Sequence, residues 1–221
     1  MNIILNGCNN EIHFQNNNNN NDYEGVAFLD RDGVVINEKV YIRDPKDVEL
    51  NPGIKEVLTF LNLANYKIVI ITNQSGIGRG LFGWNEYLGV TKRMIYLLGE
   101  RIKINSIYAC GSINENDCEW RKPGTGMIFA GWSRELLDNK NSILIGDKSS
   151  DIEAGIRANI KNLFHILTGH GESEKDNVKS LIKISQYLYG GENLEGNLFF
   201  QNNNLYYLLD NLKKVVDSKP K

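Results

Sequence analysis

The chain has 221 residues, of which 41% are hydrophobic and 24% are charged, and its formal net charge at pH 7 is -2. This is the composition of a globular protein, long enough for one α/β domain with a substantial core. The small net charge offers no broad electrostatic attraction to nucleic acids or anionic membranes, and no apolar run approaches the ~20 residues that a membrane-spanning helix needs.

Residues 1–24 stand apart because they contain an unbroken run of asparagines, Asn16 to Asn21. Low-complexity polar sequence without an apolar period cannot build a core, so we predict a mobile, asparagine-rich N-terminal extension. Residues 25–221 are predicted to form a single domain, whose tail from about residue 169 is less regular than the rest.

Apolar runs and amphipathic segments alternate from Val26 onward. The predicted strands are residues 26–30, 67–72, 106–110, 142–146 and 163–167. The predicted helices are residues 52–65, 85–103, 125–138, 150–158 and 205–216. Strands that alternate with helices predict a Rossmann-like three-layer α/β sandwich around a central, mostly parallel sheet.

Two carboxylates, Asp30 and Asp32, follow directly on the first apolar run. Burying them at the end of a strand is costly unless a hard cation such as Mg²⁺ compensates their charge, together with phosphate oxygens. Gly33 then lets the backbone turn sharply and lets a ligand come close. The motif indicates phosphate chemistry centred on an aspartate, although an acidic turn after a strand would give the same residues.

Further polar residues stand where the next strands end. Thr72 and Asn73 close the second strand, Asp147 and Asp151 follow the fourth, and a separate loop carries Arg121–Lys122. In an open parallel sheet, ligands bind outside the carboxyl ends of the strands. We therefore expect these side chains to meet at one edge of the sheet and to form a site.

The glycine-rich loop at residues 76–80 lacks the spacing of a Rossmann fingerprint and the terminal residues of a P-loop. We interpret it as a flexible substrate loop. Arg79 in this loop either binds an anion or is a solvated surface charge.

Together these residues resemble the four motifs of the haloacid dehalogenase superfamily. The matching segments, in the order that the family has them, are Phe28–Val34, Ile71–Gly80, Arg121–Pro123 and Ile145–Gly155. More narrowly, residues 26–168 resemble the D-glycero-D-manno-heptose 1,7-bisphosphate phosphatase branch, which is close to histidinol-phosphate phosphatase. Four motifs in order are far more specific than one. The spacings after the first two motifs leave no room for a large cap domain.

The resemblance implies a catalytic role for each motif. Asp30 would be the nucleophile that forms an aspartyl-phosphate, and Asp32 would be the general acid and then the general base. Thr72 and Lys122 would hold the phosphoryl oxygens and offset charge in the transition state. Asp151 would orient Lys122 or the surroundings of the metal.

The resemblance also implies Mg²⁺ as the cofactor. Its ligands would be the side chains of Asp30 and Asp147 and the backbone carbonyl of Asp32. The residues implied to bind the rest of the substrate are Asn73, Arg79 and Arg121.

One departure from the family concerns zinc. Members of this branch often carry a structural zinc loop of the form Cys-x-His then Cys-x-Cys just before Arg-Lys-Pro. The matching positions here are Cys110, Ser112, Cys118 and Trp120. A tetrahedral zinc site needs four ligands, so we predict no zinc and two thiols on a loop, close to each other. With Cys8 the number of cysteines is odd, and reduced thiols are expected.

The leading hypothesis is a cytoplasmic, monomeric phosphoric monoester hydrolase that removes the C7 phosphate of a heptose bisphosphate for lipopolysaccharide, S-layer glycan or capsule. Its partner would be a small sugar phosphate, with no nucleic acid and no membrane. The second hypothesis is another small-molecule phosphatase of the same fold, histidinol-phosphate phosphatase first. A non-catalytic binding module would be favoured by loss of Asp30 or Asp32, and both are present. A polynucleotide 3′-phosphatase would need a basic groove, which the net charge does not support.

Overall fold

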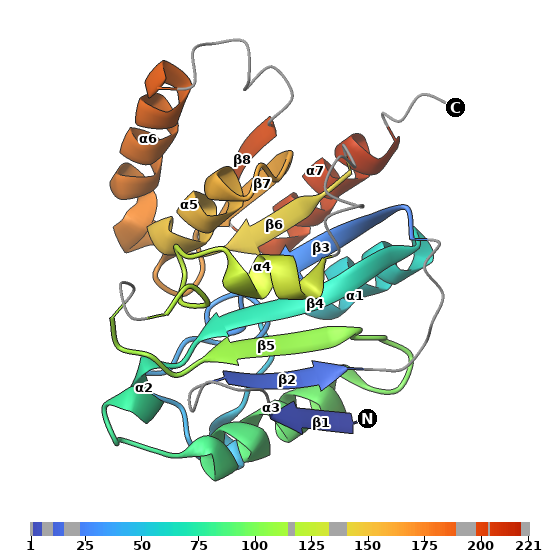
Figure 1. Cartoon of the computed structure of the whole chain (residues 1–221). Coiled ribbons are helices and arrows are strands. Elements are labelled where there is room, and N and C mark those ends of the chain that lie inside the picture. The colour runs from blue at the N-terminus through green and yellow to red at the C-terminus, as the bar shows by residue number, and fades with distance from the viewer. Residues whose placement is uncertain are drawn as a thin grey trace.

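The protein is built on one eight-stranded sheet (Figure 1), seen here in a computed structural model that describes residues 2–5, 11–15, 23–114, 118–132, 141–188, 198–202 and 204–217. The strands are β1 (Asn2–Leu5), β2 (Glu11–Gln15), β3 (Gly25–Leu29), β4 (Tyr66–Asn73), β5 (Ser106–Cys110), β6 (Ile143–Gly146), β7 (Asn162–Ile166) and β8 (Leu198–Asn202). Their order in the sheet is β1-β2-β5-β4-β3-β6-β7-β8. The strands from β5 to β8 in this order are parallel, and β2 and β1 continue the sheet antiparallel to β5.

Helices cover both faces of this sheet. The helices are α1 (Ile54–Leu63), α2 (Ser75–Gly78), α3 (Trp84–Leu98), α4 (Gly126–Gly131), α5 (Ser149–Arg157), α6 (Gly171–Leu188) and α7 (Leu205–Asp217). In Figure 1, α4, α5 and α6 lie in front of the sheet, and α1, α3 and α7 lie behind it. The predicted three-layer α/β sandwich is therefore confirmed.

Strand β3 shows why the central strands are apolar throughout. Ala27 and Leu29 pack into the core on the side of α1, α3 and α7, while Val26 and Phe28 pack into the core on the side of α4 and α5. A parallel strand that is covered on both faces buries every side chain, so it reads as a continuous apolar run. This burial fixes β3 at the centre of the sheet and places the residues that follow it at the carboxyl edge.

Most predicted elements are present, with shifted ends. Each of the five predicted strands is found, as are the helices predicted at residues 52–65, 85–103, 150–158 and 205–216. The helix predicted over 125–138 ends early, because α4 stops at Gly131 and the next residue is extended. The remainder of that prediction, from residue 133, lies outside the described residues.

Two regions, the N-terminus and the tail, differ from what the sequence indicates. We expected a mobile extension before residue 25, whereas β1 and β2 form an antiparallel pair that joins the edge of β5, with Ile12 opposite Ala109. Backbone hydrogen bonds to an open sheet edge need no apolar period, which is why the pattern gave no signal. The asparagine run lies outside the described residues. In the tail, α6 and β8 were likewise not predicted.

The connection from β3 to α1 is short. Residues 30–53 contain one short 3₁₀ helix at Pro45–Asp47 and form a flap, in keeping with the absence of a large cap domain. Within the described ranges, none of the helices combines the length and the hydropathy required to cross a membrane.

Candidate active site

The candidate site lies at the carboxyl edge of the sheet, where three neighbouring strands end. Leu29 of β3 lies between Ile70 of β4 and Ile145 of β6 in the parallel register. The amide of the next residue, Asp30, donates a hydrogen bond to the carbonyl of Ile145 at 3.0 Å. The register therefore brings together the polar residues that follow these strands, as the sequence predicts.

Asp30, Lys122 and Asp151 form a buried ionic chain. The Nζ of Lys122 lies 2.7 Å from Oδ1 of Asp30 and 2.6 Å from Oδ1 of Asp151, and it donates a third bond to the carbonyl of Ile71 at 3.0 Å. Burial alone would lower the pKa of Lys122, but the charges of Asp151 and Asp30 outweigh it and raise that pKa above its ordinary value. Lys122 is therefore a fixed cation beside Asp30.

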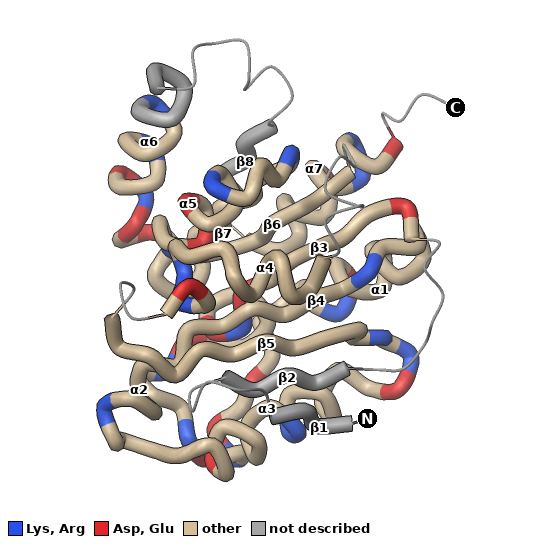
Figure 2. The backbone as a smooth tube through the Cα atoms, in the orientation of Figure 1, with Lys and Arg blue, Asp and Glu red and all other residues tan. Residues whose placement is uncertain are grey.

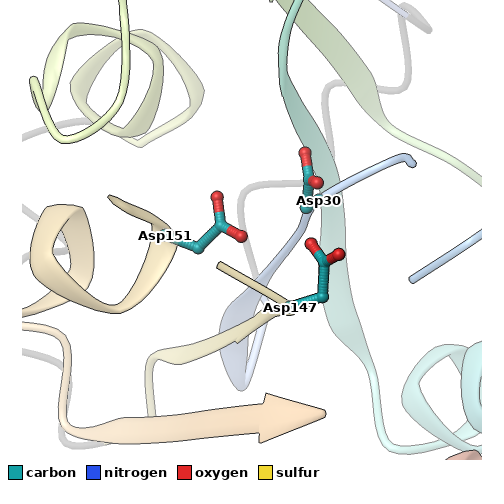
Figure 3. A group of neighbouring side chains, drawn as sticks. All are labelled: Asp30, Asp147 and Asp151. Atoms are coloured by element: carbon teal, nitrogen blue, oxygen red, sulfur yellow. The ribbon is translucent and has the colours of Figure 1, made fainter. Parts of the chain in front are cut away.

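A third carboxylate, Asp147, completes an acidic cluster (Figure 3). One oxygen from each of Asp30, Asp147 and Asp151 lies within 4.8 Å of the others, and all three residues are buried. Burial raises the pKa of Asp30 to about 6, against the opposing charge of Lys122. Burial, together with the charges of Asp30 and Asp151, raises the pKa of Asp147 to about 9. One lysine does not neutralise three carboxylates, so the cluster favours a further positive charge.

The surroundings of Asp147 fit a small, hard cation. Its Oδ2 accepts a hydrogen bond from the amide of His170 at 2.8 Å, whereas its buried Oδ1 has no hydrogen-bond partner among the described residues. Gly33 has a φ of +87°, and a Cβ there would lie 2.3 Å from Oδ2 of Asp147. Glycine is thus required for this close approach. Carboxylate oxygens are the ligands that Mg²⁺ prefers, so Asp30 and Asp147 could hold it.

Asp32 is held from two sides. Arg31, which is fully buried, donates from Nη2 to both carboxylate oxygens of Asp32 at 2.9 Å, and its guanidinium lies 5.1 Å from the ring centroid of Tyr87. Nε2 of Gln74 donates to Oδ2 of Asp32 at 2.7 Å, and the hydroxyl of Thr72 lies 3.4 Å from the same oxygen. These contacts fix the orientation of the Asp32 carboxyl group.

The loop before α4 is anchored by Asn73. Its side chain donates to the carbonyl of Lys122 and accepts from the amide of Lys122, each at 3.0 Å. Arg121 donates from Nη1 to the carbonyl of Ser112 at 2.8 Å. Asn73 thus sets the backbone position from which Lys122 reaches Asp30, in addition to any contact with a substrate.

A pocket of about 250 Å³ opens beside Asp32. Polar residues that line it include Asp32, Glu38, Asn73, Gln74, Lys148 and His170. Glu38 lies 3.7 Å from Nζ of Lys148 and 3.5 Å from Nε2 of His170. The pocket therefore places several polar side chains next to the acidic cluster, and among them Lys148 supplies a cation that suits an anionic small molecule.

The structure brings together most of the residues predicted for the site, but Arg79 is separate. It follows α2 on an exposed loop and does not line the pocket. Arg31, Glu38 and His170 were not singled out from the sequence. The only feature of the sequence that pointed to Arg31 was its position between Asp30 and Asp32. No feature of the sequence pointed to Glu38 or His170, because these two residues come together only in the folded chain.

Comparisons with known proteins agree with this geometry. The family model of polynucleotide kinase 3 phosphatases matches residues 25–180. The D-glycero-alpha-D-manno-heptose-1,7-bisphosphate 7-phosphatase of Photorhabdus laumondii is 41% identical over 157 residues, which are 67% of this chain and 86% of that protein. The D-glycero-beta-D-manno-heptose-1,7-bisphosphate 7-phosphatase of Haemophilus influenzae is 34% identical over 176 residues, which are 74% of this chain and 96% of that protein.

A solved structure is similar over almost its whole length. The D,D-heptose 1,7-bisphosphate phosphatase from B. bronchiseptica, complexed with magnesium and phosphate, superimposes with a TM-score of 0.68 at 25% identity, and the match covers 86% of this chain and 98% of that one. The chain therefore belongs to the haloacid dehalogenase-like phosphatases, in the branch of the heptose bisphosphate phosphatases, and is a phosphoric monoester hydrolase.

Proposed function

We propose that this phosphatase removes the C7 phosphate of a D-glycero-D-manno-heptose 1,7-bisphosphate, with Mg²⁺ and through an aspartyl-phosphate on Asp30. The observation that carries the proposal is the similarity to relatives of both anomeric specificities that are named as 7-phosphatases of this sugar. The acidic cluster, the buried lysine and the adjoining polar pocket supply the groups that such a reaction needs. The product would serve heptose biosynthesis.

In this proposal Asp30 attacks the phosphorus and Lys122 binds a phosphoryl oxygen. A carboxylate that approaches an anionic phosphate is repelled, so the cation 2.7 Å away lowers the barrier. Thr72 lies at the end of β4, and its hydroxyl would donate a hydrogen bond to the transferring phosphoryl group. Asp151 holds Lys122 at 2.6 Å and acts as a positioning residue.

Asp32 would move the protons of the reaction. It donates a proton to the leaving sugar oxygen and later accepts one from the attacking water. Proton transfer requires the donor to be within hydrogen-bond reach of the leaving oxygen, so the orientation of the carboxyl group matters more than its mere presence. Arg31 and Gln74 supply that orientation by binding the carboxylate from two sides.

Mg²⁺ would be held by the side chains of Asp30 and Asp147 and by the backbone carbonyl of Asp32. When bound, it supplies positive charge that offsets the nucleophile and the phosphate together. The free Oδ1 of Asp147 and the elevated pKa values of Asp30 and Asp147 support this assignment. Because an oxygen of Asp151 is engaged by Lys122, we place Asp151 beside the metal rather than among its ligands.

The stability of the protein is expected to depend jointly on Mg²⁺ and pH. Folding raises the pKa of Asp30 to about 6 and that of Asp147 to about 9, from an ordinary value of 3.8. A carboxyl group whose pKa is raised by folding makes its full contribution to stability at pH values below its ordinary pKa. That contribution is lost as the pH rises through the pKa that the group has in the folded protein. The metal-free protein should therefore lose stability from about pH 4 to about pH 9.

Mg²⁺ takes the place of the protons on Asp30 and Asp147, so the stabilisation that it gives should increase as the pH rises. In thermal unfolding, the rise in Tm on adding Mg²⁺ should be larger at about pH 8.5 than at about pH 5.5. The variant Asp147→Asn should show little of this rise at either pH. An equal rise at both pH values, or an undiminished rise in the variant, would contradict the assignment.

Arg31→Lys tests the positioning of Asp32. A lysine keeps the positive charge but cannot bind both carboxylate oxygens in the same fork. We expect kcat to fall by about 10²-fold with KM little changed, because a misdirected acid slows the chemical step alone. The matched control is Arg93→Lys, since Arg93 also lies over a tyrosine, Tyr96, but away from the site. If kcat were the same in the two variants, Arg31 would have no role in positioning Asp32 for catalysis.

The proposed function is tested by phosphate release with Mg²⁺ from a panel of phosphate esters. The panel contains both anomers of heptose 1,7-bisphosphate, histidinol phosphate, fructose 1,6-bisphosphate, an aryl phosphate and an oligonucleotide 3′-phosphate. We expect kcat/KM for one heptose anomer to exceed all other values by about 10²-fold or more. Similar values across the panel, or a preference for another ester, would reject the substrate while leaving the phosphatase assignment in place.

The oligonucleotide belongs in the panel because of the name of the matching family model. Figure 2 shows the described lysines and arginines dispersed over several helices and loops, with acidic residues among them. A protein that binds nucleic acid usually concentrates its basic residues along one groove. The charge distribution thus favours the small sugar phosphate.

A further inference from the structure

Among its described residues, the loop that follows β5 lacks the ligands of a tetrahedral zinc site. The hydroxyl of Ser112 donates to the carbonyl of Asn114 at 3.1 Å, and the ring of Trp120 packs edge-on against Tyr108 with centroids 5.5 Å apart. Within the described part of this loop only two soft ligands are left, Cys110 and Cys118. Tetrahedral zinc needs four.

The two thiols are in contact with each other. The Sγ atoms of Cys110 and Cys118 are 3.4 Å apart, and neither forms a disulfide in this structure. A disulfide bond is about 2.05 Å long, so the sulfurs need to approach by little more than an ångström. Cys110 is fixed at the end of β5, and Cys118 belongs to a loop, which can supply this movement.

We propose that Cys110 and Cys118 are a modification site, where a low-molecular-weight disulfide such as oxidised glutathione introduces an intramolecular disulfide. The thiolate of Cys118 attacks one glutathione sulfur, the glutathione disulfide breaks, and one glutathione leaves as a thiolate. Cys110 then loses its proton and attacks Sγ of Cys118, and the second glutathione leaves. The protein loses two electrons and two protons, and one glutathione disulfide becomes two glutathione thiols.

Burial decides the order of these two steps. Cys110 is fully buried, whereas Cys118 is partly exposed. Burial also raises the pKa of the Cys110 thiol to about 12, so Cys110 carries little thiolate and is not the thiol that attacks the external disulfide. A bulky disulfide reaches Cys118 first, and the neighbouring Cys110 then displaces it.

The proposed disulfide would join two segments that carry the active site. The carbonyl of Cys110 accepts a hydrogen bond from the amide of Gln74 at 2.7 Å, and Gln74 holds Asp32. The carbonyl of Cys118 accepts from the amide of Arg121 at 3.0 Å, directly before Lys122. The disulfide would thus fasten the lysine-bearing loop to the sheet.

The experiment uses the full chain with Cys8→Ser as background, so that two thiols remain. The protein is equilibrated with glutathione buffers of increasing oxidation, quenched with iodoacetamide, and its free thiols and zinc content are measured. We expect both thiols to be lost together and zinc to be absent. Proteolysis after Glu115 separates the two cysteines in sequence, so the two peptides should stay joined until a reductant is added.

Thermal unfolding gives a second readout. Closing this loop should raise Tm by roughly 5 °C in the oxidised protein, and the rise should vanish with reductant. The variant Cys118→Ser should show no such rise, and Cys110→Ala serves where the serine variant folds poorly. A glutathione that stays attached to Cys118, an equal Tm rise in the variants, or stoichiometric zinc lost in Cys118→Ser would each overturn the proposal.

Discussion

Replacing Asp30 by asparagine is expected to lower kcat by about 10⁴-fold or more while leaving the fold intact. The amide has nearly the same shape as the carboxyl group but is not a nucleophile towards phosphorus. The substitution also removes one negative charge from a buried cluster that holds three carboxylates, and Lys122 keeps its ion pair with Asp151, so the protein should not lose stability. Phosphate release under single-turnover conditions measures the effect, and thermal unfolding shows that the fold remains.

The control for this experiment is the same substitution elsewhere, Asp210→Asn on the exposed side of α7, which should leave kcat unchanged. Deamidation would convert part of the Asp30 variant back to the parent protein, so the intact mass of each preparation has to be checked. Asp30 would not be the nucleophile if the verified variant kept activity within tenfold of the parent chain.

Removing the buried cation should affect both stability and catalysis. Lys122→Met leaves Asp30 and Asp151 without the ammonium group that lies within 2.7 Å of each, and breaking a buried ion pair in this way costs about 3–5 kcal/mol of unfolding free energy. In the same variant kcat/KM should fall by about 10³-fold, because the charge that faces the transferring phosphoryl group is lost. Denaturant unfolding in the absence of metal and steady-state kinetics measure the two effects.

A second substitution separates these two roles of Lys122. In the double variant Lys122→Met with Asp151→Asn, one uncompensated charge is gone, so part of the stability should return while activity stays low. Lys179→Met on the exposed face of α6 is the matched control and should change neither quantity. A Lys122→Met protein as stable as that control would show that the buried chain is not an ionic support of the fold.

The parallel part of the sheet could be predicted because its strands are buried on both faces. β3 and β5 are entirely buried, and in such strands nearly every residue is apolar, which is visible in the sequence without knowledge of neighbours. β1 and β2 gave no such signal, because these strands are defined by backbone pairing, of β2 with β5 and of β1 with β2. Pairing at an edge depends on a partner that is distant in the chain, and the local pattern does not contain it.

The same distinction applies to the site. Asp30, Thr72 and Asp147 could be predicted to meet because each follows a predicted strand, and parallel strands end at one edge. Arg31 and Glu38 could not be placed in this way. Arg31 is buried against Tyr87 of α3, and Glu38 faces His170 from a loop far away in the sequence. Such contacts are set by helix packing and loop paths, which no short motif records.

The addition of β1 and β2 to the edge of the sheet at β5 affects how readily two copies of the protein can associate. Without it, β5 would present a row of unsatisfied amides and carbonyls, the kind of template onto which a strand from another molecule can add. With β1 and β2 in place, the edge of the sheet on this side is β1, a strand of only four residues. Short border strands give an incoming chain little to pair with, so the hairpin shields the molecule against strand-to-strand aggregation.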